Sequence, residues 1–186
     1  SFVEQEDVFE VVEKLMIQLF KKFSPGKSIN EKFPRIPYLE AMAKYGTDKP
    51  DLRNPLIIED ITNIFTRKDV EFEIFKKLVK SGSVVKVITT KKTKDKPRSF
   101  FDNIDKWAKE QGASGLAYFT IEKDKKIKGK GPVGKFFSEE SIKEIMKICK
   151  AEVGDSFFFA CGKKKEIEKL LSLARDTISK ELKIID

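Results

Sequence analysis

The sequence predicts an α+β fold, a two-layer domain in which helices cover a mainly antiparallel sheet. Three observations predict it. Hydrophobic residues make up 40% of the chain and 16 residues are phenylalanine, which favours a packed interior over disorder. The middle of the chain alternates between short strand-like runs and capped helices. A longer amphipathic helix is expected near each end, so that helices flank the central unit.

The first 55 residues are expected to form one long helix and a loop-rich connector. From Glu6 to Phe23 apolar residues recur at helical spacing, and Pro25 and Gly26 follow directly. The connector, residues 24–55, contains five of the seven prolines and a short helical stretch over residues 38–45. Because proline fixes φ and removes a backbone donor, most of this connector is expected to lack regular structure.

The central unit is expected to hold the strands. Five short runs rich in β-branched and aromatic residues predict them. These runs are residues 71–75, 83–90, 116–122, 133–137 and 157–159. We expect the fourth run to pair with the third, which would place both in one antiparallel sheet.

Two helices are predicted within the central unit and one after it. Ser99 is expected to cap a helix that runs to Gln111, and Ser138 to cap a second helix whose apolar residues share one face. The last helix, residues 164–182, is amphipathic. Two helices packed on one antiparallel sheet account for a domain of roughly 95 residues.

The composition excludes several classes of active site. The chain has no histidine, which rules out His-based acid–base chemistry, Ser-His-Asp and Cys-His arrangements and two-His zinc sites. The two cysteines, Cys149 and Cys161, lack metal-ligand spacing and predict reduced thiols in the cytosol. No apolar run approaches the roughly 20 residues that span a bilayer. We therefore expect a soluble, cytoplasmic protein with no membrane partner.

One glycine-rich segment imitates a nucleotide-binding motif. Residues 129–135 match G-x-G-x-x-G and nearly match the P-loop. However, the segment follows a run of lysines instead of a hydrophobic strand, and Pro132 removes a backbone donor where phosphate would bind. Phe136 stands where a P-loop needs Ser or Thr. A basic surface turn is the better interpretation.

The positive charge is concentrated in two segments. Residues 76–98 contain nine basic residues and one acidic residue, a local net charge that equals the +8 of the whole chain, and residues 123–135 add six lysines and one aspartate. Such clusters favour polyanions, although a chain with 33 lysines and five arginines also places lysine on any solvated surface. Because lysine lacks the planar fork of arginine, base-specific readout is not expected. The predicted nucleic-acid contacts are Lys91, Lys92, Lys94, Lys96 and Arg98.

A run of nine residues resembles a family signature. The residues are Tyr45, Gly46, Thr47, Asp48, Lys49, Pro50, Asp51, Leu52 and Arg53. They are similar to the Tyr-Gly-Ser/Thr-Asp-Lys-Pro-Asp-Leu-Arg signature of bacterial-type aspartyl-tRNA synthetases, a family of class II enzymes. Three further runs, residues 115–118, 132–136 and 154–159, resemble the GAD insertion domain of that family. The resemblance covers essentially the whole chain.

The resemblance implies three parts. Residues 1–66 are expected to be a segment of the catalytic core that carries the signature, and residues 67–162 the GAD insertion domain. Residues 163–186 are expected to form a helix that returns to the core. Both ends of the chain are expected to be cuts within a longer protein, because neither resembles a natural terminus.

The resemblance also implies what the parent enzyme does. The family joins aspartate to its tRNA through an aspartyl-adenylate, with ATP and magnesium, and the parent is expected to be a homodimer. The residues that hold aspartate and ATP lie in motifs outside these 186 positions, so no catalytic, cofactor-binding or metal-binding residue is assigned here. We expect the isolated chain to be inactive and its insertion to face tRNA. For Asp48, Lys49 and Arg53 a structural role is favoured, in a proline-containing turn pinned by ion pairs.

A second hypothesis remains open. In it, the chain is an independent basic module that binds nucleic acid or another protein and has no enzymatic activity. The two hypotheses differ in what the neighbouring coding region encodes. The first requires an in-frame arginine-containing motif upstream and a glycine-rich motif downstream.

Overall fold

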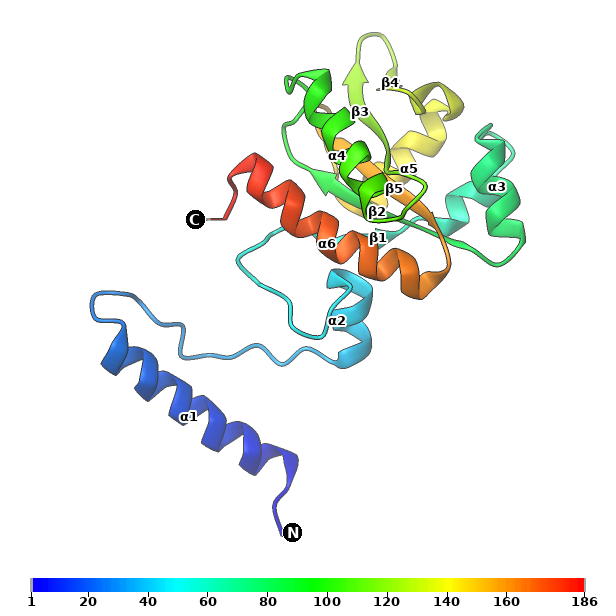
Figure 1. Cartoon of the computed structure of the whole chain (residues 1–186). Coiled ribbons are helices and arrows are strands. Elements are labelled where there is room, and N and C mark those ends of the chain that lie inside the picture. The colour runs from blue at the N-terminus through cyan, green and yellow to red at the C-terminus, as the bar shows by residue number, and fades with distance from the viewer. Residues whose placement is uncertain (1, 186) are drawn as a thin grey trace. The chain divides into compact units, whose positions relative to one another are not determined.

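Two compact units make up the chain in a computed structural model, which describes residues 2–185 (Figure 1). The units are residues 1–37 and 38–186, and each is described by itself. The second unit contains the sheet and its helices. The residues that the sequence singles out as functional all lie within it.

Five strands form one antiparallel sheet in the second unit (Figure 1). The strands are β1 (Ile58–Asp60), β2 (Val84–Thr90), β3 (Ala117–Lys123), β4 (Ile127–Lys130) and β5 (Ser156–Gly162). Their order across the sheet is β1, β2, β5, β3, β4. In the register, Val87 lies opposite Phe159, and Phe119 lies opposite Phe157. β5 therefore runs through the centre of the sheet, where both of its faces are buried.

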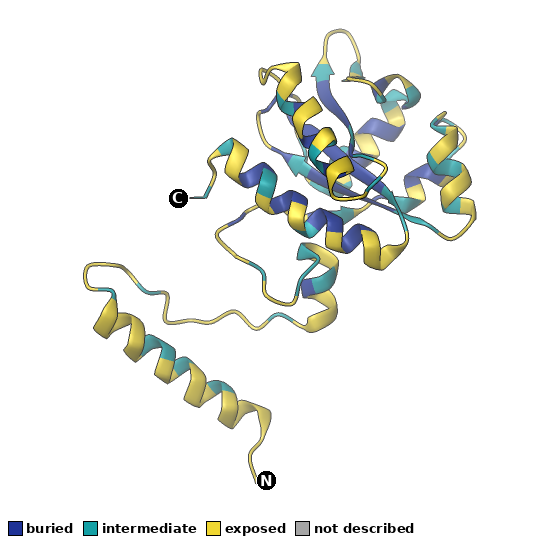
Figure 2. Cartoon of the chain, viewed as in Figure 1, coloured by how far each residue is buried: buried dark blue, intermediate teal, exposed yellow. Residues whose placement is uncertain are grey.

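Helices cover both faces of this sheet, and their inward sides are buried (Figure 2). On one face lie α4 (Arg98–Glu110) and α6 (Lys164–Leu182); on the other lie η1 (Thr62–Thr66), α3 (Glu73–Lys80) and α5 (Glu139–Cys149). Two shorter elements are α2 (Tyr38–Tyr45), which contacts α6 and β1, and η2 (Gly134–Phe136), which contacts β4. The predicted α+β class, with a mainly antiparallel sheet covered by helices, is confirmed.

Three consecutive phenylalanines of β5 join the two helix layers. Phe157 and Phe159 belong to the cluster beneath α3 and α5, whereas Phe158 belongs to the cluster beneath α4 and α6. All three are at most 1% exposed. Burying each ring contributes about 1.5–3 kcal/mol. The alternation of these rings is what a strand buried on both faces requires.

The prediction of a strand over residues 71–75 is wrong. The chain forms α3 there, from Glu73 to Lys80. Phe72, Phe75 and Val79 are three and four residues apart, so they share one helix face, and this face packs into the core. A window of five residues is too short to separate this helical period from the period of a strand.

The prediction that residues 133–137 pair with residues 116–122 is also wrong. β3 pairs with β4 instead, with Ile121 opposite Gly129, while residues 134–136 form η2. Glycine is needed at position 129 because an added Cβ would lie 2.9 Å from the ring of Phe119. The lysines of β4 point to solvent and made this strand look like a surface turn.

The remaining helices are confirmed, with one change of boundary. Ser138 caps α5, and its side chain accepts a hydrogen bond from Ser141 N (3.0 Å). α4 begins at Arg98, so Ser99 lies inside the first turn and the N-cap position is occupied by Pro97. The fixed φ of proline suits the extended backbone that precedes a helix.

α6 supplies much of one core layer. Its buried apolar residues are Ile167, Leu170, Leu171, Ala174 and Ile178. β1 also lies outside residues 67–162, and it pairs with β2. The folded unit therefore extends beyond the expected insertion in both directions. The limits at 67 and 162 stay a prediction about the organisation of the parent.

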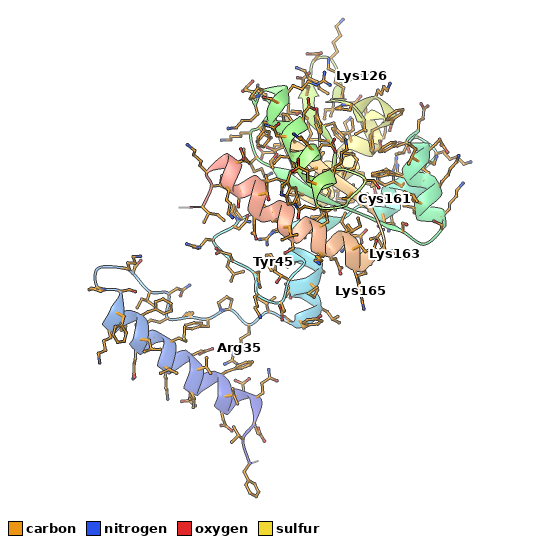
Figure 3. The ribbon with its side chains drawn as sticks, viewed as in Figure 1. Arg35, Tyr45, Lys126, Cys161, Lys163 and Lys165 are labelled. Atoms are coloured by element: carbon orange, nitrogen blue, oxygen red, sulfur yellow. The ribbon has the colours of Figure 1, made fainter. Side chains whose placement is uncertain are left out.

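In the first unit, α1 (Gln5–Phe23) confirms the first predicted helix. Glu4 N donates to Asp7 Oδ2 (2.9 Å), which satisfies one of the donors at the start of the helix. Arg35 lies in the extended segment that follows (Figure 3). It forms an ion pair with Glu6 of α1. This ion pair joins the extended segment to the helix within the unit.

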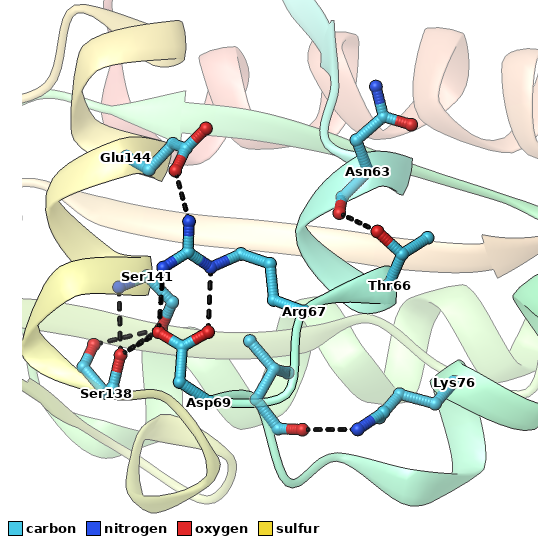
Figure 4. A network of polar contacts seen from close by, with 9 residues as sticks. Asn63, Thr66, Arg67, Asp69, Lys76, Ser138, Ser141 and Glu144 are labelled. Carbon is cyan, nitrogen blue, oxygen red and sulfur yellow. Dashed lines mark hydrogen bonds and ion pairs between the residues drawn. The ribbon is translucent and has the colours of Figure 1, made fainter.

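A charged network fixes the start of α5 (Figure 4). The guanidinium of Arg67 donates to both carboxylate oxygens of Asp69 (2.8 and 2.9 Å) and to Glu144 (2.5 Å). The hydroxyl of Ser138 donates to Asp69 Oδ2 (2.5 Å). The hydrogen bond from Arg67, followed by that from Ser138, lowers the pKa of the Asp69 carboxyl to about 2. The network links the segment before α3 to the N-terminus of α5.

Protonation of Asp69 is expected to weaken the fold in acid. Its folded pKa of about 2 lies below its ordinary value of 3.8, so its contribution is complete above that value and is lost as the pH falls through 2. Because a third of the side chain is exposed, we expect a contribution of only about 1 kcal/mol. Urea denaturation from pH 5 downward measures it. The difference in unfolding free energy between the wild type and Asp69→Asn should shrink as the pH falls.

The matched control is Asn63→Ala, which changes an exposed, uncharged neighbour in η1. Its difference from the wild type should not vary with pH, because no titratable group is removed. A difference for Asp69→Asn that stays constant down to pH 2 would contradict the role assigned to the carboxylate.

Candidate nucleic-acid interface

A buried carboxylate organises the predicted contact loop, residues 91–98. Asp155, which is 2% exposed, lies in the turn before β5. Its Oδ1 accepts a hydrogen bond from Lys92 N (2.9 Å), and its Oδ2 accepts from Lys91 Nζ (2.8 Å) and from Glu152 N (2.9 Å). Lys92 has a left-handed backbone, with φ of 53°. The first turn of the loop is therefore tied to the sheet.

Hydroxyl groups lie beneath the middle of the loop. Thr93 is buried, and its Oγ1 lies 2.8 Å from Thr90 Oγ1 and 2.8 Å from Ser156 Oγ. Ser156 Oγ lies 2.9 Å from Thr120 Oγ1 on β3. These buried hydroxyls satisfy one another, as buried polar groups must. Thr93 thus anchors the loop while the residues on both sides of it stay at the surface.

Two of the five predicted contacts already have acidic partners. Lys91 is paired with Asp155 and also donates to the main-chain oxygen of Lys150 (2.6 Å). Arg98 is paired with Asp102 across one turn of α4 (3.2 Å). A phosphate that bound either cation would compete with a carboxylate, so these two residues are the weaker candidates.

The other three predicted contacts are more available to an anion. Lys96 Nζ lies 5.9 Å from the ring centre of Phe100, an arrangement that leaves its charge uncompensated. The ammonium groups of Lys92 and Lys94 have no ion-pair partner within residues 2–185. All three side chains belong to exposed residues. They are the cations that phosphate can reach without displacing a carboxylate.

The fold brings the second basic segment to the same end of the sheet. β2 and β3 end there and β5 begins there, because neighbouring strands are antiparallel. Ile121 N donates to Asp155 O (2.9 Å) and Gly154 N donates to Ile121 O (2.8 Å), so the β3–β4 hairpin leaves the sheet beside the turn that holds the loop. The C-terminus of α5 joins this end through the bond between Lys91 and Lys150.

We call this surface the basic end. Within the hairpin, Asp124 is paired with Lys128, and Glu122 with Lys130 (2.8 Å). Lys126 lies at the hairpin tip (Figure 3). The cations of the basic end are Lys91, Lys92, Lys94, Lys96, Arg98, Lys123, Lys125, Lys126 and Lys150. The sequence shows two separate basic segments, residues 76–98 and 123–135. The loop after β2 and the hairpin after β3 lie at the same end of the sheet because both strands pair antiparallel with β5.

Four lysines of the first basic segment do not belong to this surface: Lys76, Lys77 and Lys80 lie on α3, and Lys86 lies on β2. Lys86 is 4% exposed and its Nζ lies 3.4 Å from Glu168 Oε1 on α6. Asp60 Oδ2 lies 4.0 Å away on β1. Lys86 therefore forms a buried ion pair beneath α6, and a ligand at the surface cannot reach its ammonium group.

The signature residues begin in tight contact with α6. Gly46 has φ of 69°, and a Cβ added there would lie 2.2 Å from Glu168 O and 3.0 Å from Ser172 Cβ. A side chain is therefore excluded both by the left-handed backbone and by the neighbouring helix. Glycine at this position lets the backbone after α2 lie directly on α6.

A buried arginine of α6 holds both sides of the signature. Arg175 is 1% exposed, and its Nε donates to Leu56 O (2.6 Å) while its Nη2 donates to Asn54 O (3.2 Å). Its guanidinium carbon lies 4.9 Å from the ring centre of Tyr45. Burial lowers the pKa of Arg175. Sequence reasoning missed this residue because nothing local to α6 marks it.

Within the signature, Asp51 and Arg53 form an ion pair. Arg53 Nε and Nη2 donate to the two carboxylate oxygens of Asp51 (3.0 and 2.7 Å), and this pairing lowers the pKa of Asp51. Lys49 N donates to Thr47 Oγ1 (3.2 Å). Asp48 and Lys49 are exposed, and their side chains form no ion pair within residues 2–185. The turn is therefore held by the ion pair of Asp51 with Arg53, by the contact of Gly46 with α6 and by Arg175, and not by ion pairs of Asp48 or Lys49.

The acidic and sulfur-containing side chains of the described residues form no metal site. Within residues 2–185, no three His, Cys, Asp or Glu side chains lie close enough together to hold a metal ion. Burial raises the pKa of Cys149 to about 12 and that of Cys161 to about 11, so neither thiol is ionised near neutral pH. No helix of the described residues is long and apolar enough to cross a bilayer.

The chain belongs to the GAD domain family, whose model matches residues 75–171. Its relatives include proteins named aspartate–tRNA(Asp/Asn) ligase. The one from Pelagibacter ubique is 74% identical over 186 residues, which is all of this chain. Those from Wolbachia pipientis and Ehrlichia chaffeensis are 48% and 47% identical, also over the whole chain. The chain spans 30–31% of the length of these relatives. The resemblance to bacterial-type aspartyl-tRNA synthetases is confirmed.

Proposed function

We propose that these residues are a segment of an aspartyl-tRNA synthetase, which attaches aspartate to tRNA with ATP and magnesium. The observation that carries the proposal is the 74% identity to an aspartate–tRNA(Asp/Asn) ligase over the whole chain. The name of that relative covers tRNA for aspartate and for asparagine, which supports both as substrates of the parent. In this proposal the parent is a cytoplasmic homodimer.

The proposal assigns a supporting role to this segment. Residues 1–66 and 163–186 belong to the catalytic core, and residues 67–162 are the GAD insertion. Aspartate, ATP and magnesium bind to residues outside the chain, so the isolated chain should form no aspartyl-adenylate and no aminoacyl-tRNA. What the segment contributes to the core is the docking of the signature on α6, since both flanks of the insertion meet there.

Reading the neighbouring coding sequence tests the assignment to a synthetase. An in-frame arginine-containing motif upstream and a glycine-rich motif downstream are expected. Stop codons that confine the reading frame to these residues would support the independent module instead. Turnover by the purified chain with ATP, aspartate and tRNA would contradict the supporting role.

For the insertion, we propose that the basic end contacts the phosphate backbone of tRNA. Its cations come from three elements, and its loop is held by Asp155, so that Lys92, Lys94 and Lys96 stay at the surface. Eight of its nine basic residues are lysine, which suits phosphate more than base edges. Binding is therefore weak, insensitive to sequence and strongly dependent on salt.

Replacing Lys92, Lys94 and Lys96 by glutamine should weaken tRNA binding and reduce its salt dependence. Each phosphate that is no longer neutralised lowers the slope of log affinity against log salt by roughly 0.7–0.9, so the slope should fall by about 2 and the affinity about tenfold or more. Lys91 is kept because it holds the loop through Asp155. Titration of the chain with tRNA at several salt concentrations measures both quantities.

The matched control removes three exposed lysines at the other end of the sheet, Lys77, Lys80 and Lys164, again by glutamine. It lowers the net charge equally but should change the slope much less. Equal losses in the two variants would mean that only the total charge matters and that the basic end is not the contact surface. Melting temperatures should stay nearly unchanged in both, because exposed lysines contribute little to stability.

A further inference from the structure

A groove of about 850 Å³ lies at the end of the sheet opposite the basic end. It runs between α3 and α6, with the C-terminal turn of α4 also lining it. Its two long walls are apolar: Phe72, Phe75 and Leu78 come from the α3 side, and Ile167, Leu170 and Leu173 from α6. We call it the strand-edge groove, because the end of β5 also lines it.

The end of β5 lacks a strand on its groove side. The pairing of β3 with β5 stops at Ala117, which lies opposite Phe159, yet β5 continues to Gly162. Before Ala117 the chain turns away, held by a hydrogen bond from Leu116 N to Asp105 Oδ1 (2.9 Å). Within the described residues no strand pairs with residues 160–162 on this side. An unpaired edge of this kind is a template for an added strand.

A strand placed along this edge would be buried on both faces. α3 would cover one face and α6 the other, so consecutive apolar side chains would fit, instead of the alternating pattern of a half-exposed strand. The apolar surface is at present exposed: Ile74 is 66% exposed and Leu173 is 42% exposed. Exposed apolar side chains gathered around a groove mark an interaction site.

The mouth of the groove beside α6 is positively charged. Lys163, Lys164 and Lys165 stand at the N-terminus of that helix, where the macrodipole already favours anions and disfavours cations. Figure 3 shows Lys163 close to Cys161, which lines the groove. Lys169, on the groove wall, has no ion-pair partner within residues 2–185. Two acids also line the groove: Glu166 is paired with Lys163 (3.8 Å), and Asp105 on the opposite wall is paired with Lys109 (2.6 Å). Lys164, Lys165 and Lys169 therefore leave the mouth with a net positive charge. The mouth of the groove is therefore complementary in charge to a ligand with acidic residues.

The aromatic residues of the groove do not favour nucleic acid. The ring of Phe72 is stacked on Phe75 at 4.4 Å and on Phe136 at 5.2 Å, so its faces are not free to stack on a base. The ring of Phe75 also packs against Phe65 and Phe159, and the other apolar side chains of the walls are aliphatic. An unpaired strand edge binds the main chain of a peptide, for which a nucleic acid has no equivalent.

We propose that the strand-edge groove binds an extended segment of another polypeptide. The segment has three or four consecutive apolar residues with acidic residues on each side. It pairs with β5 over residues 160–162, places its apolar side chains against α3 and α6, and places its acidic flank near the N-terminus of α6.

Fluorescence anisotropy with the whole chain tests this. The probe is a labelled peptide with the central run Val-Ile-Val-Phe flanked by glutamates. We expect saturable binding that weakens with salt. Leu173→Glu, which adds a like charge to one apolar wall, should weaken it at least tenfold, as should Leu78→Glu on the other wall. Val153→Glu is the matched control, since Val153 is an apolar residue exposed to a similar degree, 46%, at the other end of the sheet. It should leave the affinity unchanged.

Two further measurements identify the mode of binding. A peptide with the same side chains but N-methylated in its central run cannot donate main-chain hydrogen bonds, and it should bind at least tenfold more weakly. Hydrogen exchange of amides in residues 160–162 should slow when the unmodified peptide binds. The proposal is overturned if the peptide fails to saturate, if Val153→Glu weakens binding as much as both groove variants, or if single-stranded RNA displaces the peptide.

Discussion

Replacing Gly46 by alanine should destabilise the second unit by about 3–5 kcal/mol, a large part of the stability of a typical domain. The left-handed backbone alone disfavours alanine by about 1–2 kcal/mol. In addition, the new Cβ would lie 2.2 Å from Glu168 O, a main-chain atom inside α6 that cannot rotate away. Either α6 shifts or the signature leaves it, and both outcomes disrupt buried packing.

Gly82→Ala is the matched control for this prediction. Gly82 also has positive φ, 92°, but nothing lies within 4 Å of an added Cβ. It should therefore lose only the backbone contribution of about 1–2 kcal/mol. Urea denaturation of the three proteins gives the difference directly. Equal losses at the two glycines would show that the contact with α6 has no energetic importance.

Arg175→Met should destabilise the second unit by about 3 kcal/mol. Methionine fills a similar volume, but the oxygens of Asn54 and Leu56 would lose their charged donor in a buried place. Removing one partner of a buried polar contact costs more than replacing both, because the other partner is left unsatisfied. The cation–π interaction with the ring of Tyr45 would also disappear. Hydrogen exchange in residues 45–56 should accelerate more than exchange in β5.

Arg98→Met provides the comparison, because the Arg98 side chain is 83% exposed although it also forms an ion pair. Its effect should stay within about 0.5 kcal/mol. Arg175→Lys separates charge from geometry: a lysine keeps the charge but cannot reach both oxygens in the way the planar guanidinium does. If Arg175→Lys and Arg98→Met are equally mild, the bidentate geometry at position 175 is not what holds the signature.

The sequence predicts the parts of the fold in which local pattern and tertiary environment agree. α6 and α5 have apolar residues at helical spacing and bury that same face, so both were predicted correctly. α3 fails this condition because the run in which a strand was expected, residues 71–75, contains Phe72 and Phe75 and is too short to show a helical period. β4 was not predicted as a strand because two of its four residues are exposed lysines. Only Ile127 and Gly129 face inward, and two such residues are too few to show the alternation of a strand.

The sequence predicts those parts of the candidate sites whose residues are neighbours along the chain. The lysines of residues 91–96 and the signature are contiguous, so the sequence indicates them directly. The residues that hold them in place are distant: Asp155 lies 63 positions from Lys92, and Arg175 lies 119 positions from Leu56. An aspartate before a strand and an arginine within an amphipathic helix have no local feature that separates them from solvated charges. Only their burial does so, and burial is a property of the folded chain.

The antiparallel sheet separates the two ends at which we propose binding, the basic end and the strand-edge groove, by the length of a strand. Seven residues of β5 span roughly 23 Å, whereas charges in physiological salt are screened beyond about 8 Å. An RNA at one end and a peptide at the other would therefore neither touch nor repel one another, and their binding free energies would add. A partner that carried both ligands on one tether would gain avidity from the rigid spacing alone, provided that its linker could bridge this distance.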